Sequence, residues 1–229
     1  ADYAAALADV LGDRVGFWTT LNEPWCAAFL GHAAGVHAPG HTDGAEALAA
    51  THHLLLGHGL AMRNLRSQLP AGTQLAITLN PAVARPATAS DEDLVACSKV
   101  EGLQNRIWLE PLFRGQYPDD VKEFTARVSD WSFVQDGDLQ LISAPIDVLG
   151  VNYYNPVVVA HYDGSGQRSQ SDGHGDGSGS PWIGCDDVQF IDVPGRHTAM
   201  DWPVDASGLT ELLRRLWHEY RTPMLITEN

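Results

Sequence analysis

The sequence has little positive charge and no long hydrophobic run. Lysine and arginine together number 14 against 29 acidic residues, which gives a formal net charge of -15. An acidic chain is a poor match for nucleic acid or an anionic membrane surface, because like charges repel. No apolar run reaches the roughly 18 residues that a membrane-spanning helix needs. We therefore expect neither nucleic acid nor a membrane as a partner.

Cysteine is also scarce, and a glycine-rich phosphate-binding loop is missing. The three cysteines, Cys26, Cys97 and Cys185, give no disulfide framework and no paired metal-ligand spacing. This usage fits a reducing compartment, so we expect a cytoplasmic protein. The chain starts without Met inside a helical pattern and stops directly after a strand-like run. We therefore expect an internal piece of a longer protein.

The sequence does contain a regular alternation of helical and strand-like segments. The strand-like segments are short, apolar and rich in β-branched or aromatic residues, and they cover 14–22, 73–81, 144–156 and 223–229. Helical spacing and capping signals predict five helices. The first ends at Gly12, the second runs from Asp43 to the break before Pro70, and the third runs from Ser90 toward 109–113. A short helix follows near 119–124, and the last covers 208–220. This alternation predicts an α/β fold with a parallel sheet, which suits either a doubly wound sheet or half of a (β/α)8 barrel.

Polar residues at the carboxyl ends of the strands favour the barrel. They are Asn22 and Glu23, Asn80, Asn152 with Tyr154, and Glu228 with Asn229. A (β/α)8 barrel collects its chemistry on that face from several strands at once. One segment, 163–180, is rich in Gly and Ser, and we predict a flexible surface loop there.

Two of these residues, Glu23 and Glu228, each stand beside an Asn. Glycoside hydrolysis commonly uses two carboxyl groups on either side of the bond to be cut, one protonated and one ionised. A separation of about 5 Å raises the pKa of one of them, because two close negative charges repel. A single Glu after a strand is more often a solvated loop residue or a helix cap, so the spacing alone leaves a coincidence open.

Longer motifs around both glutamates resemble glycoside hydrolase family 1, the β-glucosidase family. "TLNEPWCAAFLGHAAGVHAPG" resembles the acid/base segment of that family, and "LITEN" resembles its nucleophile segment. Between them, "HHLLLGHGLA", "LQNRIWLEPLFRGQYP", "IDVLGVNYYNP" and "TAMDWPVDASGL" resemble the same family in the same order. The resemblance covers nearly the whole chain.

The resemblance implies a partial (β/α)8 TIM barrel that holds approximately strands 4 to 7 with their helices. Residues 1–229 would then be a single, incomplete catalytic domain. It also implies retaining hydrolysis of terminal β-linked sugars in β-glucosides or oligosaccharides. By this likeness Glu228 attacks the anomeric carbon, and Glu23 first protonates the leaving oxygen and then deprotonates water.

Supporting roles follow from the same resemblance, which implies no metal and no organic cofactor. Asn22 would bond the sugar 2-hydroxyl, Tyr154 would donate a hydrogen bond to Glu228, and Trp202 would form an apolar platform for the leaving group. Asn152 is a further substrate-binding candidate. Without the motifs, Tyr154 and Trp202 also suit core positions, and Asn152 suits a backbone turn.

Other residues receive a structural interpretation. Trp25 and Cys26 flank Glu23 and are interpreted as packing residues. A helical set of histidines lacks the glutamate of a zinc-protease motif and is assigned to structure; it comprises His52, His53 and His58. Asp201 stands where the family usually has Gly.

Two other functions stay open. A non-catalytic sugar-binding relative would keep the fold but not the reaction. An unrelated (β/α)8 enzyme would need a catalytic Lys, metal ligands or a phosphate loop at the strand ends. The preferred sugar and the oligomeric state cannot be read from these residues.

Overall fold

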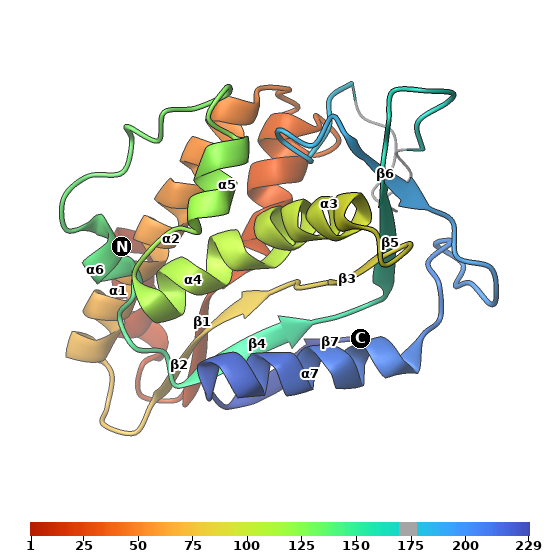
Figure 1. Cartoon of the computed structure of the whole chain (residues 1–229). Coiled ribbons are helices and arrows are strands. Elements are labelled where there is room, and N and C mark those ends of the chain that lie inside the picture. Colours follow the sequence, from red (N-terminus) through yellow and green to blue (C-terminus); the bar gives the residue numbers. More distant parts are fainter. Residues whose placement is uncertain (170–177) are drawn as a thin grey trace.

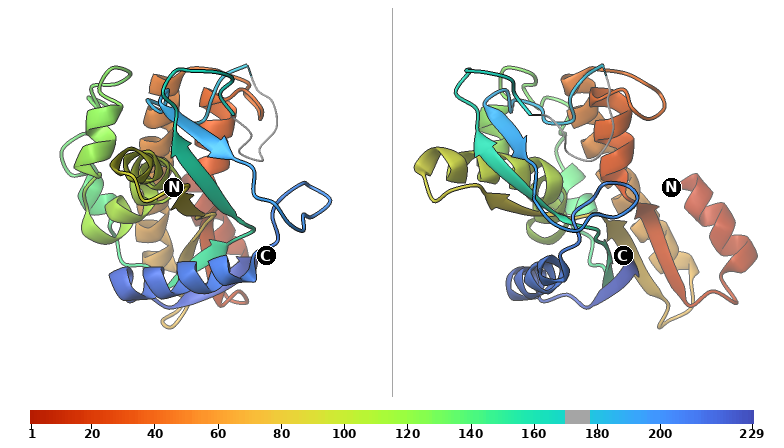
Figure 2. Two further views of the ribbon diagram at one scale, coloured as in Figure 1. Left: turned by 45° about the vertical axis from the view of Figure 1, so that its right-hand side comes forward. Right: turned by 90° about the vertical axis from the view of Figure 1, so that its right-hand side faces the viewer.

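The computed structural model describes residues 1–169 and 178–229, and a four-stranded parallel sheet forms its centre (Figure 1). Its strands lie in the order β1 (Phe17–Asn22), β2 (Gln74–Leu79), β4 (Val148–Asn152) and β7 (Met224–Glu228). These are the four strands that the sequence predicts. The right-hand view of Figure 2 shows them side by side, with β1 at one edge and β7 at the other. The sheet is therefore open and does not close on itself.

One helix precedes the first strand and others connect successive strands of this sheet, as the alternating pattern predicts. The longer ones are α1 (Asp2–Leu11), α2 (Gly44–Gln68), α3 (Asp91–Glu101), α4 (Ile107–Arg114) and α7 (Ala206–Tyr220). Shorter ones are α5 (Asp119–Phe124), α6 (Asp138–Ile142) and the π-helical turns η1 (Cys26–Ala33) and η2 (Gly102–Arg106). Within the described residues, no helix combines the length and apolar character that crossing a bilayer requires.

The core lies between the sheet and these helices. Ile77 of β2 and Leu149 of β4 pack in one buried cluster with Trp108 of α4 and Leu216 of α7. Residues of β2 and β4 after Gln74 are buried on both faces, which is why these strands are continuously apolar in the sequence.

A second sheet was not predicted. It pairs β3 (Val83–Pro86) with β5 (Pro156–His161) in parallel, and β5 with β6 (Val188–Ile191) antiparallel. The sequence prediction over 144–156 was correct for β4 but too long, because β4 ends at Asn152 and β5 starts at Pro156. β3 and β5 follow the carboxyl ends of β2 and β4. The second sheet therefore lies on the side of the four-stranded sheet where the polar strand ends lie.

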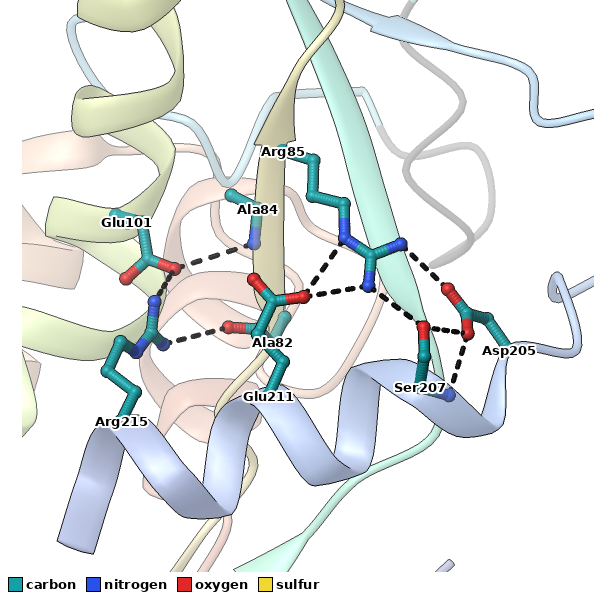
Figure 3. A network of polar contacts seen from close by, with 8 residues as sticks. All are labelled: Ala82, Ala84, Arg85, Glu101, Asp205, Ser207, Glu211 and Arg215. Atoms are coloured by element: carbon teal, nitrogen blue, oxygen red, sulfur yellow. Dashed lines mark hydrogen bonds and ion pairs between the residues drawn. The ribbon is translucent and has the colours of Figure 1, made fainter. Parts of the chain in front are cut away.

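Helix α7 is fastened to the second sheet by ion pairs (Figure 3). Arg85 of β3 contacts Asp205 at 2.7 Å and Glu211 at 2.8 Å. Asp205 also caps α7 by accepting a hydrogen bond from the Ser207 backbone. Hydrogen bonds from Ser207 and Arg85 lower the pKa of Asp205 to about 2. This network fixes the start of α7 and the loop before it, which carries Trp202.

The predicted loop over 163–180 lies between β5 and β6. Its residues 170–177 lie outside the described residues, and its flexibility stays a prediction.

Candidate active site

The two glutamates of the predicted pair come from opposite edges of the four-stranded sheet. Glu23 directly follows β1, and Glu228 ends β7. Asn152 ends β4, and its side-chain nitrogen lies 2.8 Å from Glu23 Oε1 and 2.8 Å from Glu228 Oε1. The two carboxylate oxygens can therefore be no further apart than twice this distance. Folding brings together two acidic side chains that are remote in the sequence.

Asn152 is the centre of this arrangement and is fully buried. Its nitrogen also lies 3.1 Å from Asn22 Oδ1, and its oxygen accepts a hydrogen bond from Thr227 Oγ1. The amide nitrogen carries two hydrogens and faces three acceptor oxygens, those of Asn22, Glu23 and Glu228. A donor that lies between the two carboxylates stabilises both of them. Asn152 therefore holds the pair in place in addition to lining the neighbouring cavity.

Tyr154 lies on the other side of Glu228. Its hydroxyl donates a short hydrogen bond to Glu228 Oε2, the contact that the family resemblance implies. Burial, the hydrogen bond to Glu228 and the charge of Glu23 raise the pKa of Tyr154. The hydroxyl thus keeps its proton at neutral pH. The Tyr154 ring also packs against Trp202 with centroids 5.1 Å apart.

Cys26 packs against the buried core, as the sequence predicts, and it also contacts Glu23. Its thiol donates to Glu23 Oε2 at 3.4 Å and accepts from Asn80 Nδ2 at 3.6 Å. Burial and the nearby Glu23 charge raise the pKa of Cys26 to about 12, which keeps the thiol a donor. Trp25, by contrast, is buried in the core as expected.

The backbone at Glu23 has an unusual conformation that aims its side chain. Its φ is +46°, in the left-handed region that costs a non-glycine residue about 1 kcal/mol. Hydrogen bonds from the Glu23 N–H to Thr78 O and from the Cys26 N–H to Glu23 O hold this turn, both at 3.0 Å.

A cavity of about 540 Å³ opens beside the two carboxylates. Four predicted site residues line it, namely Glu23, Asn152, Tyr154 and Trp202, whereas the predicted Asn22 and Glu228 are not among its lining residues. The roles of all six stay predictions. The sequence prediction missed further lining residues from the loops and from η2: His37, Gln104, Asn155, Trp182 and Met200. Gln104 could have been noticed, because it lies in one of the motifs and its amide fixes the Asn80 backbone at 2.8 Å. This mixture of aromatic and hydrogen-bonding groups suits a small polar ligand with apolar faces.

The sequence assigns all three helical histidines to structure, and the contacts of His52 and His58 agree with this assignment. His52 is buried between Tyr117 and Asp138, with both contacts at 3.0 Å. His58 Nδ1 lies 2.7 Å from Thr20 Oγ1, which ties α2 to β1. His53 is exposed and its ring contacts the Ala49 carbonyl of its own helix.

Comparison with known proteins decides the family. The family model described as "Glycosyl hydrolase family 1" matches residues 1–229. The chain belongs to glycosyl hydrolase family 1. A bifunctional β-D-glucosidase/β-D-fucosidase from Bifidobacterium breve is 43% identical over 230 residues, which cover 100% of this chain and 47% of that relative. β-Glucosidase A from Thermotoga maritima is 33% identical over 231 residues, 100% of this chain and 47% of that protein. The chain thus spans about half the length of the curated relatives it matches.

Solved structures of family 1 enzymes agree with this assignment. A psychrophilic β-glucosidase from Micrococcus antarcticus superposes with a TM-score of 0.90 at 40% identity, over 100% of this chain and 49% of that one. A β-glucosidase from Thermotoga maritima in complex with deoxynojirimycin gives 0.85 at 31% identity, over 99% of this chain and 47% of that one. These family 1 neighbours are TIM barrels, so the open sheet is part of a (β/α)8 barrel, which confirms the predicted fold class.

Asp201, which stands where the family resemblance implies a Gly, has a left-handed backbone. Its φ is +61°, a conformation that glycine adopts without strain. The Asp201 carboxylate lies 2.7 Å from His197 Nδ1, a contact that glycine cannot make. The substitution leaves the two glutamates untouched.

Proposed function

We propose that the protein containing this chain is a retaining β-glycosidase of the β-glucosidase type. The observation that carries the proposal is the shared Asn152 amide, which limits the separation between Glu23 Oε1 and Glu228 Oε1 to twice 2.8 Å. Retaining glycosidases hold their carboxyl groups about 5–5.5 Å apart, whereas inverting enzymes need about 6.5–9.5 Å to admit a water molecule.

In the proposed reaction Glu228 is the nucleophile and forms a covalent glycosyl-enzyme. The Tyr154 hydroxyl bonds Glu228 Oε2 and the Asn152 amide lies 2.8 Å from Glu228 Oε1, so both oxygens of the attacking carboxylate are held in position. Glu23 donates its proton to the leaving oxygen. In the second step Glu23 takes a proton from water, and that water releases the sugar from Glu228.

The remaining site residues position the sugar. Asn22 lies beside the carboxylate pair, and we assign it a hydrogen bond to the sugar 2-hydroxyl. Trp202 lines the cavity and offers an apolar face to the leaving group, and Asn152 holds both carboxylates. The reaction requires only these side chains and water, without a metal or an organic cofactor.

The proposed substrates are small β-glucosides or oligosaccharides. The relatives named above are β-glucosidases, one of them also a β-D-fucosidase, and one solved neighbour holds deoxynojirimycin. A sugar-binding protein without activity has no need for two carboxylates around one amide donor, which disfavours that alternative.

The stereochemistry of the product tests the proposal. The full-length polypeptide that contains this chain is mixed with a nitrophenyl β-glucoside, and the first-formed sugar is followed by proton NMR. We expect the β-anomer to form first and to mutarotate later. Initial release of the α-anomer would refute a retaining mechanism.

A further inference from the structure

Three side chains outside the carboxylate pair bring metal-binding atoms together. His32 lies near the end of η1, His41 lies in the following loop, and Glu46 lies in the first turn of α2. One ligand atom of each lies within 4.8 Å of the other two. Two imidazole nitrogens and a carboxylate oxygen are a donor set that suits zinc and similar transition metals.

The backbone brings these side chains together without help from a metal. The His41 N–H donates to the Gly31 carbonyl at 2.9 Å, and the Asp43 N–H donates to the His32 carbonyl at 2.7 Å. Asp43 then caps α2 by accepting hydrogen bonds from the backbone of Ala45 and Glu46. The loop is therefore folded back onto η1 and preorganised.

The Glu46 side chain does not form the hydrogen bond that a capping box would give it. In a capping box its side chain would return to the N–H of Asp43. That N–H is already bonded to His32 O, and the Glu46 carboxylate turns to the imidazoles instead. Its Oε2 lies 2.8 Å from His41 Nδ1, and its Oε1 lies 3.4 Å from His32 Nδ1.

One ring nitrogen of His32 has no hydrogen-bond partner among the described residues. This atom, Nδ1, is buried and makes no hydrogen bond within residues 1–169 and 178–229. A buried nitrogen that faces a carboxylate oxygen without a hydrogen bond is unfavourable. A cation between the two histidines and Glu46 would satisfy all three groups.

We propose that His32, His41 and Glu46 bind one Zn²⁺ ion. The ion would join η1, the loop and the first turn of α2, with a further coordination position left to water. The same loop carries His37, which lines the candidate active-site cavity. The ion's role is to stabilise this loop, and it takes no part in the chemistry of Glu23 and Glu228.

Zinc titration tests the site. The full-length polypeptide, freed of metal by a chelator, is titrated with ZnCl₂ in a calorimeter. We expect saturable binding of one ion, and at least about a tenfold loss of affinity in each of His41→Ala and Glu46→Gln. His218→Ala, which removes an exposed histidine of α7, is the matched control and should keep the parent affinity.

Thermal unfolding gives a second readout that requires no turnover. Zinc should raise the Tm of the parent and of His218→Ala but not of His41→Ala. Absence of saturable binding, or equal affinity in all variants, would overturn the proposal and leave an ion-paired cluster only. Because neither measurement uses a glycoside, the result is independent of the proposed glycosidase activity.

Discussion

At the scale of single residues, the neutral amide of Asn152 explains how two carboxylates can share one site. A cation in its place would add a positive charge beside both groups. An amide donates to both Glu23 and Glu228 without adding charge. The amide is therefore compatible with the division of roles that we propose, in which one carboxyl group donates a proton and the other attacks.

Glu23→Gln should separate substrates by their leaving groups. The variant keeps the shape of the side chain but cannot donate the proton. We expect kcat/KM to fall about 10²–10⁴-fold for alkyl β-glucosides and much less for dinitrophenyl β-glucoside, whose leaving group needs little protonation. Steady-state kinetics of both substrates measure this, and an equal loss on both would exclude Glu23 as the acid.

Tyr154→Phe should reduce kcat without unfolding the protein. It removes the hydrogen bond to Glu228, and a bond to a charged group contributes about 1.5–3 kcal/mol, or roughly 10–100-fold in rate. Tyr162→Phe is the control, because its hydroxyl bonds the Gly166 carbonyl in a loop. Wild-type kcat in Tyr154→Phe would show that this contact does not orient the nucleophile.

Sequence reasoning predicted the placement of residues whose position is set by the strand that carries them, whereas the catalytic and binding roles of these residues stay predictions. Glu23, Asn152 and Glu228 follow or end apolar strands, and parallel strands place their carboxyl ends together. It missed the contact of Cys26 with Glu23 and the contact of Gln104 with Asn80, because both depend on how π-helical turns fold beside the sheet. No local pattern reports such a turn.

At the scale of elements, the attachment of α2 to β1 depends on a histidine that must stay neutral. Burial lowers the pKa of His58 from its ordinary 6.5 to about 4. Between these values the unfolded chain binds a proton that the folded chain does not bind. His58 should therefore contribute a decrease of about 3 kcal/mol to the free energy of unfolding as the pH falls from 6.5 toward 4.

The variant His58→Gln should flatten this dependence, since glutamine keeps a polar group near Thr20 but does not titrate. Urea unfolding of the full-length polypeptide between pH 7.5 and pH 4 compares this variant with the wild type and with His218→Gln. The latter is a control at an exposed position of α7. A pH slope in His58→Gln that equals the slope of both other proteins would contradict the assignment.

The elements that the sequence missed are short and lie within crossovers. β3 and β6 have four residues each, and β5 starts with a proline, so period-two alternation has little length in which to appear. Their pairing joins segments that are far apart in the chain. Strands β2 and β4 of the four-stranded sheet were predictable because burial on both faces makes them continuously apolar.

At the scale of the whole molecule, the open sheet leaves apolar surface exposed. Leu225 and Ile226 of edge strand β7 are each 45% exposed, and Tyr3 of α1 is 78% exposed. Unpaired strand edges and exposed apolar side chains favour aggregation. Relatives in which these segments match have about twice the length of this chain.

We therefore predict that residues 1–229, expressed alone, aggregate or unfold without cooperativity and do not hydrolyse nitrophenyl β-glucoside. Light scattering, circular dichroism and a nitrophenol assay measure these properties. Measurable turnover by the purified 229-residue chain would contradict this prediction.

The three cysteines are free in the structure, whereas the cytoplasmic location inferred from them stays a prediction.

The most direct test of the account identifies the nucleophile chemically. The full-length polypeptide is inactivated with a 2-fluoro β-glucoside, digested, and examined by tandem mass spectrometry. The account predicts one fluoroglucosyl group, attached to Glu228. A label on any other residue, including Glu23, would contradict it.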